Sequence, residues 1–222
     1  MSSPATVLFA RGLKGVIFDC DGVMLDSRAG NNAFYNSVLA CLGLPPMSRE
    51  QENYVYMATV GQSLRHIVPQ ALHGEIDRVV REEVSYERDI MPLLRLMPGF
   101  AELSADLHSH GLRQAIATNR SAEGMQRVLD FFALPPYFEP VITASDAAPK
   151  PSPEGALRIC AAWGVTPEQV LFVGDSPNDE QAAHAAGMAF AAFDNNTLAG
   201  ELHAADHAAL RLALRPWLPS GE

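Results

Sequence analysis

The most informative segment of this sequence is Gly15-Val16-Ile17-Phe18-Asp19-Cys20-Asp21-Gly22, a short apolar run that leads into two aspartates and a glycine. An apolar run without polar alternation is typical of a strand that is buried on both faces of a parallel sheet. Comparable runs follow at Gln114–Thr118, Pro140–Thr143, Val170–Val173 and Met188–Phe193. The pattern therefore predicts an α/β fold with a Rossmann-like parallel sheet sandwiched by helices.

Helical signals separate these runs from about residue 97 onward. Ser121 is a suitable N-terminal cap for a helix that carries Met125 and Val128 on one face. Gly164 provides a natural stop for another helix, and Thr166 begins a capping-box pattern. Alternation of strands and helices predicts right-handed crossovers between parallel strands.

The segment between about Arg28 and Leu94 breaks this alternation. Its apolar residues recur at helical spacing, and it contains almost no strand signal. We therefore expect a helical domain over residues 27–94, inserted after the first strand. Residues 1–26 and 95–222 would together form the α/β core domain.

The composition of the 222 residues argues against several classes of protein. With 26 acidic and 16 basic residues, the net charge is −10, which argues against nucleic acid as the main partner. Cys20, Cys41 and Cys160 are scattered in a way that suits neither a disulfide framework nor a zinc site. No apolar run approaches the roughly 18 residues of a membrane span, and the first residues lack the pattern of a signal peptide. We therefore expect a cytoplasmic protein without a membrane partner.

Polar and charged residues gather where the predicted strands end. In an open parallel sheet, ligands bind outside the carboxyl ends of the strands. Four of the predicted strands lead into such residues, either directly or through the next loop. These residues are Asp19 and Asp21, Thr118 and Asn119, Lys150, and Asp175 and Asp179. We expect them to meet at one rim of the sheet.

Three of these aspartates, Asp19, Asp21 and Asp175, form a predicted metal site. Residues two apart at a strand end can point the same way, so the carboxylates of Asp19 and Asp21 are expected to crowd together, near Asp175. A divalent cation would relieve the repulsion, and oxygen ligands favour Mg²⁺, which accepts a phosphate as a further ligand. Lys150 and Thr118 would then supply a cation and a hydroxyl donor for phosphate oxygens.

The sequence resembles the haloacid dehalogenase-like superfamily at its four ordered motifs, here Asp19-Cys20-Asp21-Gly22-Val23, Thr118, Lys150 and Gly174-Asp175-Ser176-Pro177-Asn178-Asp179. The resemblance extends from Gly15 to about Phe193 and is to the branch of phosphoglycolate phosphatase and β-phosphoglucomutase. It implies a Mg²⁺-dependent phosphatase, a phosphoric monoester hydrolase acting on a small phosphorylated metabolite of the phosphoglycolate or sugar-phosphate type. We expect a monomer or a homodimer.

The resemblance further implies roles for the aspartates. Asp19 would be the nucleophile that forms an aspartyl-phosphate, and Asp21 would protonate the leaving alcohol and later activate water. The role of Asp21 calls for a carboxyl pKa that is raised by anionic neighbours. The Mg²⁺ ligands would be the Asp19 side chain, the Asp21 main-chain carbonyl, Asp175 and, directly or through water, Asp179.

The remaining assignments concern the substrate. By the same resemblance, Thr118 and Lys150 would neutralise the phosphoryl oxygens, with help from Asn119. The helical insertion resembles the family's cap, which closes over the site and selects the substrate. Within it, Gln62 and Arg65 match the position at which related enzymes contact the leaving group, so both are candidate substrate contacts.

Alternative functions within the superfamily depend on single residues. A dehalogenase lacks a carboxylate two residues after its nucleophile, whereas Asp21 is present here. A phosphonatase needs a cap lysine for a Schiff base, and residues 28–94 contain no lysine. A sugar phosphomutase of the β-phosphoglucomutase type remains an alternative, because it uses the same four motifs. A non-catalytic interaction protein is disfavoured, because all the motif residues are intact.

Overall fold

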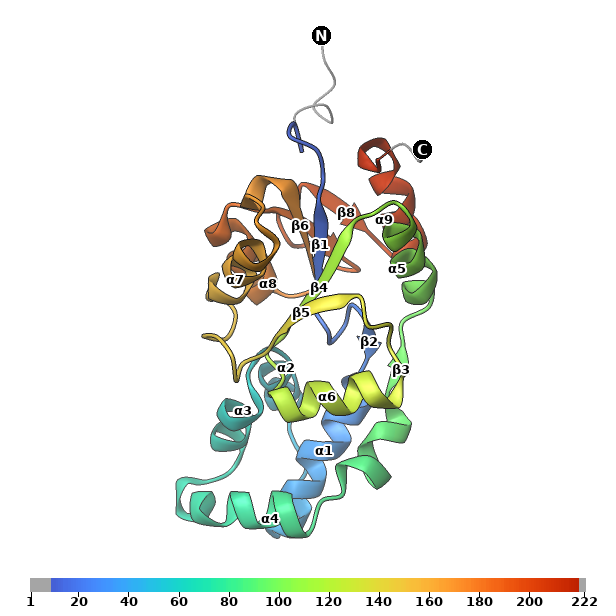
Figure 1. Cartoon of the computed structure of the whole chain (residues 1–222). Helices are drawn as coiled ribbons and strands as arrows, with labels where there is room; N and C mark the ends of the chain where they lie inside the picture. Colours follow the sequence, from blue (N-terminus) through green and yellow to red (C-terminus); the bar gives the residue numbers. More distant parts are fainter. Residues whose placement is uncertain (1–8, 220–222) are drawn as a thin grey trace.

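The computed structural model describes residues 9–219, and its central feature is a six-stranded sheet (Figure 1). The strand order is β5-β4-β1-β6-β7-β8, and every neighbouring pair is parallel. This arrangement confirms the predicted Rossmann-like α/β fold. The strands are β1 Gly15–Phe18, β4 Arg113–Ala117, β5 Phe138–Ile142, β6 Val170–Gly174, β7 Ala189–Phe193 and β8 Leu202–Ala204.

The sequence pattern locates five of these strands to within two residues but misses β8. This strand has three residues and lies at the edge of the sheet. Only its last residue, Ala204, is buried. It therefore lacks the continuous apolar run that marks strands covered on both faces.

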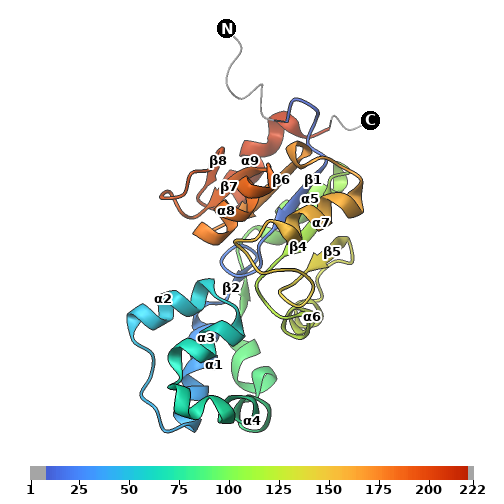
Figure 2. The same cartoon turned by 90° about the vertical axis from the view of Figure 1, so that its left-hand side faces the viewer.

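Helices cover both faces of the sheet. One face carries α7 (Glu154–Trp163) and α8 (Pro177–Ala186), and the other carries α5 (Phe100–Ser109) and α9 (His207–Leu214) (Figures 1 and 2). Successive residues of β1 alternate between two apolar cores, because neighbouring side chains of a strand point to opposite faces. Ile17 packs in the core under α7 and α8, and the next residue, Phe18, packs in the core under α5 and α9.

A helical segment follows β1 and lies at the end of the sheet where β1 leads into Asp19 (Figure 2). It is joined to the sheet by two antiparallel strands, β2 Leu25–Asp26 and β3 Arg95–Leu96. Its α-helices are α1 Arg28–Cys41, α2 Arg49–Met57, α3 Val60–Ile67 and α4 Ile76–Glu82. Shorter helical turns lie at Gln70–Glu75, Tyr86–Ile90 and Met91–Leu93.

The residues of this helical insertion enclose an apolar core of their own, which includes Phe34, Val38 and Val79. The segment is therefore helical, as predicted. The division of the chain into a core domain and a cap domain over residues 27–94 stays a prediction.

Local signals set the starts of several helices. The Ser121 side chain accepts a hydrogen bond from Gly124 N at the start of α6 (Ala122–Phe131), as predicted. Thr166 precedes the single turn Pro167–Gln169, and a further turn, Arg215–Trp217, follows α9.

Within residues 9–219, none of the helices combines the length and the apolar character that crossing a membrane requires.

Candidate active site

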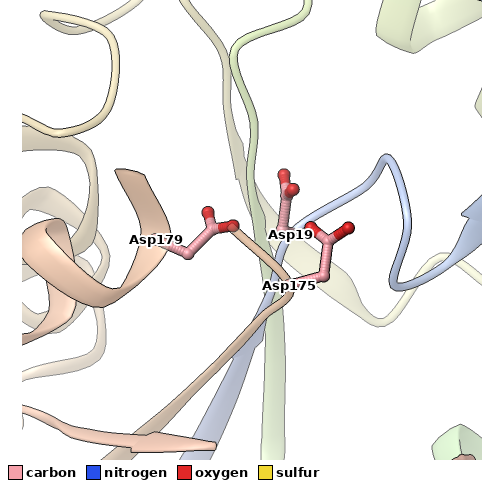
Figure 3. Close-up of side chains that lie close together, drawn as sticks. All are labelled: Asp19, Asp175 and Asp179. Atoms are coloured by element: carbon pink, nitrogen blue, oxygen red, sulfur yellow. The ribbon is translucent and has the colours of Figure 1, made fainter. Parts of the chain in front are cut away.

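Three carboxylates meet where β1 and β6 end (Figure 3). Asp19 directly follows β1, Asp175 directly follows β6, and Asp179 lies in the first turn of α8. One oxygen of each carboxylate lies within 4.8 Å of the others, and we call these three residues the aspartate cluster. Gly174 permits the close approach, because a Cβ atom at this position would lie 2.2 Å from the Cβ of Asp179.

Lys150 supplies a cation to the aspartate cluster. Its Nζ lies 2.6 Å from Asp19 Oδ1 and 2.6 Å from Asp179 Oδ1, and its side chain is only 9% exposed. Asn119 fixes the loop that carries Lys150. Its Oδ1 accepts a hydrogen bond from Lys150 N at 2.8 Å, and its Nδ2 donates to the Lys150 carbonyl at 3.1 Å. The structure therefore brings Lys150 to the aspartates and Asn119 to the loop that carries it.

Three carboxylates and one ammonium group leave an excess of negative charge. Burial, followed by the nearby charge of Asp179, raises the pKa of Asp175 to about 7. The same causes raise the pKa of Asp19 well above its ordinary value, against the opposing charge of Lys150. Asp175 Oδ1 is buried and has no hydrogen-bond partner among the described residues. The aspartate cluster could hold a metal ion, and its oxygen donors are those that Mg²⁺ prefers.

The Asp21 side chain does not join the aspartate cluster, contrary to the prediction that it crowds against Asp19. Arg120 holds it in a fork: Nη2 lies 2.6 Å from Asp21 Oδ1, and Nε lies 2.7 Å from Oδ2. Burial acts to raise the pKa of Asp21, but the charge and hydrogen bonds of Arg120 outweigh it and hold that pKa below its ordinary value. The predicted rise of this pKa is therefore wrong, because the nearest charge is a guanidinium and not a carboxylate.

Arg120 is a residue of this site that the sequence prediction missed. It follows Thr118 by two positions and is only 9% exposed. Its Nη1 donates a hydrogen bond to the Tyr86 hydroxyl at 2.8 Å, and Tyr86 belongs to the helical insertion. Arg120 thereby connects the end of β4 to that insertion. The one sequence feature that could have indicated Arg120 was its position, because it is a basic residue between a strand end and the helix cap at Ser121.

A cavity of about 610 Å³ separates the strand ends from the helical insertion. Thr118 is buried on its wall, and its Oγ1 accepts a hydrogen bond from Arg120 N at 3.1 Å. The insertion contributes apolar and aromatic side chains, including Phe34 and Val55. The cavity is therefore polar and charged toward the sheet, whereas the wall of the insertion combines these apolar side chains with charged ones: Arg81, Glu82, Glu83, Glu87 and Arg88. Core residues on its wall include Asp19, Asp21, Asn119, Lys150 and Asp175.

The two candidate cap contacts lie elsewhere. Gln62 and Arg65 are exposed on α3 and do not line this cavity. The Gln62 side chain completes a capping box, in which its Oε1 accepts a hydrogen bond from Thr59 N at 3.0 Å. The insertion instead reaches the aspartate cluster through Tyr56, whose hydroxyl donates to Asp175 Oδ2 at 3.2 Å.

Comparison with known proteins identifies the family. The model of the haloacid dehalogenase-like hydrolase family matches residues 16–193, which is most of the chain and includes every motif residue that the sequence singled out. The chain belongs to this family of hydrolases, as the sequence resemblance predicted.

Individual relatives agree with this assignment. Phosphoglycolate phosphatase 1 of Pseudomonas aeruginosa is 34% identical over 203 residues, covering 86% of this chain and 73% of that protein. The phosphoglycolate phosphatase of Cereibacter sphaeroides is 30% identical over 207 residues, covering 88% and 91%. A crystal structure of a subfamily IA hydrolase from Geobacter sulfurreducens has a TM-score of 0.71 at 35% identity, covering 90% of this chain and 95% of that one. The predicted enzyme class, a phosphoric monoester hydrolase, is confirmed at the level of the family.

Proposed function

We propose that this protein is a Mg²⁺-dependent phosphatase that hydrolyses a small phosphorylated metabolite, of the phosphoglycolate or sugar-phosphate type, through an aspartyl-phosphate intermediate. The observation that carries the proposal is the aspartate cluster, paired with Lys150 and adjoining a cavity of about 610 Å³. The names of the relatives from Pseudomonas aeruginosa and Cereibacter sphaeroides support the substrate class. The free thiols of the cysteines are consistent with a reducing compartment such as the cytoplasm.

The aspartate cluster would hold the cation. The Asp19 and Asp175 side chains and the Asp21 main-chain carbonyl would be ligands, with Asp179 acting directly or through water. The fit is supported by Asp175 Oδ1, a buried oxygen that has no partner among the described residues and that a cation would satisfy. When bound, Mg²⁺ supplies positive charge that the cluster lacks and that neutralises the oxygens of a transferring phosphoryl group.

Asp19 would act as the nucleophile. One of its carboxylate oxygens forms a bond to phosphorus while the bond from phosphorus to the leaving oxygen breaks, and Asp21 gives that oxygen a proton. A water molecule then transfers a proton to Asp21 and attacks phosphorus, which releases inorganic phosphate and restores the Asp19 carboxylate. Throughout, Lys150 and Thr118 donate hydrogen bonds to the phosphoryl oxygens, and Asn119 holds the Lys150 loop in place.

Arg120 must release Asp21 before this chemistry can proceed. Both Asp21 oxygens accept hydrogen bonds from Arg120, and the low pKa of the carboxyl keeps it ionised at neutral pH. An ionised carboxylate has no proton to give to a leaving group. Because Arg120 also binds the Tyr86 hydroxyl, a movement of the insertion would change the partners of Arg120 and free Asp21.

The cavity supports a substrate of metabolite size. Small-molecule sites typically have volumes of about 300–1,000 Å³, and this cavity lies within that range. A phosphoryl group would lie near Lys150 and Thr118, and the remainder of the metabolite would extend toward Phe34 and Val55. The carboxylate of phosphoglycolate or the hydroxyls of a hexose would need polar partners there, which charged side chains on the same wall, such as Arg81 and Arg88, could supply.

The test is phosphate release from a panel of phosphorylated metabolites that includes phosphoglycolate and hexose phosphates, ranked by kcat/KM. Each assay is run with Mg²⁺ and again with a chelator. We expect release that depends on Mg²⁺ and that favours one substrate class. Acid quenching during turnover should also trap one phosphoryl group on the peptide that contains Asp19.

The other outcomes identify the alternatives. An absence of phosphate release from every compound at saturating Mg²⁺ would contradict the proposal and favour a non-catalytic interaction protein. Isomerisation of a hexose phosphate that requires a hexose bisphosphate would instead favour the sugar phosphomutase. Equal rates with all compounds would preserve the phosphatase but contradict the proposed substrate class.

A further inference from the structure

The two oxygens of Asp175 have different surroundings. Oδ2 accepts a hydrogen bond from the Tyr56 hydroxyl at 3.2 Å. Oδ1 is buried and has no hydrogen-bond partner among the described residues. Tyr56 comes from the helical insertion, 119 positions before Asp175, whereas all three residues of the aspartate cluster come from the α/β core. One residue of the insertion thus determines which Asp175 oxygen is left for another ligand.

The end of α2 that carries Tyr56 is held against the core. The next residue, Met57, accepts hydrogen bonds at its carbonyl from Asn178 Nδ2 at 2.9 Å and from Asn119 Nδ2 at 3.3 Å. The Arg28 guanidinium stacks over the Tyr56 ring, 4.7 Å from its centroid. The hydrogen bonds to Met57 hold the backbone beside Tyr56 and the guanidinium packs on its ring, so the hydroxyl meets Asp175 in a defined geometry.

Gly22 provides the space for this contact. A Cβ atom at Gly22 would lie 2.1 Å from Asp175 Oδ2 and 2.4 Å from the Tyr56 hydroxyl. The backbone φ of +83° at Gly22 also favours glycine. The backbone, the phenol and the carboxylate therefore converge on one point, and the side chain of any other residue at position 22 would separate Tyr56 from Asp175.

We propose that Tyr56 is a positioning residue for the metal site: its hydroxyl holds Asp175 Oδ2, which turns Oδ1 toward the cation. This inference rests on the proposed function, because it requires a cation at the aspartate cluster. A carboxylate that is already oriented loses less rotational freedom when it binds a metal, and a hydrogen bond to its second oxygen maintains that orientation. The affinity for Mg²⁺ consequently depends on where the helical insertion lies.

The test is a calorimetric titration of Mg²⁺ into the full-length protein without substrate, comparing wild type with Tyr56→Phe. The variant keeps the ring and its stacking with Arg28 but loses the hydroxyl. We expect the Kd for Mg²⁺ to rise about tenfold, the usual consequence of removing a partner that orients a metal ligand.

Tyr54→Phe is the matched control. Tyr54 lies on the same helix, is 38% exposed, stacks on His66 and makes no hydrogen bond through its hydroxyl among the described residues. Its variant should bind Mg²⁺ as wild type does. Tyr54→Phe should melt at the wild-type temperature and Tyr56→Phe within a few degrees of it, because it loses one hydrogen bond; single melting transitions in both would separate an effect on the metal site from a general loss of structure.

Two results would overturn the inference: a Kd for Tyr56→Phe within about twofold of wild type, or an equal loss of affinity in Tyr54→Phe. Either result would leave the proposed phosphatase intact, provided that the wild type binds Mg²⁺ and releases phosphate. A wild-type protein that binds no Mg²⁺ would instead contradict the proposed function itself. The titration therefore distinguishes the two failures.

Discussion

Two groups of charges lie side by side at the strand ends, and they are balanced in different ways. The aspartate cluster has three carboxylates that share a single ammonium group, on Lys150. The neighbouring pair has one carboxylate, on Asp21, and one guanidinium, on Arg120, joined by two hydrogen bonds. Their pKa shifts differ accordingly: that of Asp175 is raised to about 7, and that of Asp21 is lowered.

This difference indicates what each group needs in order to function. The aspartate cluster lacks positive charge, so it should gain stability from an added cation. The pair between Asp21 and Arg120 is already neutral overall and fully hydrogen-bonded, so it should gain nothing from a cation. Asp21 can act as a general acid only after its hydrogen bonds to Arg120 have broken. The predictions that follow test whether the two groups behave independently in this way.

The largest effect is expected for Asp19→Asn, which removes the proposed nucleophile. We expect phosphate release to fall by at least about 10⁴-fold, in line with the loss of nucleophiles in other enzymes that use a covalent intermediate. The melting temperature without metal should stay at or above that of wild type, because the variant removes one of three repelling charges. Phosphate release and thermal melting measure the two effects.

Asp26→Asn serves as the control, because Asp26 is exposed on β2 and lies outside the aspartate cluster. It should leave both activity and melting temperature near the wild-type values. An Asp19→Asn protein that turns over at the wild-type rate would exclude the covalent route.

The second prediction concerns Lys150→Met, which leaves the three carboxylates without their cation. A buried ion pair that loses one partner typically costs about 3–5 kcal/mol, so we expect the free energy of unfolding without metal to fall by about that amount. Saturating Mg²⁺ should restore part of the loss, because it supplies charge at the same place. Urea denaturation with and without Mg²⁺ measures both quantities.

The chain offers a matched control in its only other lysine. Lys14 is exposed, so Lys14→Met should change the free energy of unfolding by less than about 0.5 kcal/mol. If Lys150→Met were as stable as Lys14→Met without metal, the aspartate cluster would not need the charge of Lys150. The proposed difference between the aspartate cluster and the pair of Asp21 and Arg120 would then be wrong.

The third prediction separates the pair from the aspartate cluster. Arg120→Lys keeps the positive charge but lacks the planar fork that binds both oxygens of Asp21. We expect the free energy of unfolding to fall by about 1–2 kcal/mol, while the Kd for Mg²⁺ stays within about twofold of wild type. Denaturation and calorimetric titration measure these two quantities.

Arg127→Lys is the control for the loss of a guanidinium. Arg127 lies nearby, but its side chain is 35% exposed and pairs with Glu87 and Glu123. Its replacement should have a smaller effect on stability, because exposed ion pairs contribute little. A large change of Mg²⁺ affinity in Arg120→Lys would show that the pair and the aspartate cluster act as one unit.

Sheet geometry explains why the sequence predicted part of the aspartate cluster, although the Asp21 side chain that it placed there lies outside the cluster. Parallel strands place their carboxyl ends at one edge of the sheet, so residues that follow β1 and β6 are neighbours whatever lies between them in the chain. Asp19, Asp175 and Lys150 therefore converge as predicted. Asp179 was predicted only from the family resemblance; the structure places it in the first turn of α8, where it forms a capping box with Ser176.

The contacts of the helical insertion could not be predicted, because helical periodicity does not show which face of an inserted helix meets the core. Gln62 was a candidate substrate contact, but its amide caps α3. Tyr56 and Tyr86 carried no distinguishing signal, and each bonds to a core residue that is far away in sequence. The pairing of Asp21 with Arg120, 99 positions apart, depends on side-chain orientation rather than on backbone position.

The smallest predicted effect is a dependence of stability on pH in the metal-free protein. The pKa of Asp175 is about 7 when folded, against an ordinary value of 3.8, so the folded protein binds a proton between about pH 4 and 7 that the unfolded chain does not. This contribution to stability is complete below the unfolded pKa and is lost as the pH rises through about 7. The raised pKa of Asp19 acts in the same direction.

The lowered pKa of Asp21 has the opposite sign, but its contribution is present above the unfolded value and is lost only as the pH falls through the folded one. It therefore stays constant from about pH 5 to 8, where Asp175 titrates. The melting temperature without metal should fall by a few degrees across this range, and with Mg²⁺ the fall should be reduced, because the cation displaces the proton. Asp175→Asn should reduce the slope of the metal-free profile to the part that Asp19 contributes. If that variant kept the wild-type slope, the excess negative charge would not lie at Asp175, and the contrast between the aspartate cluster and the pair would need another explanation.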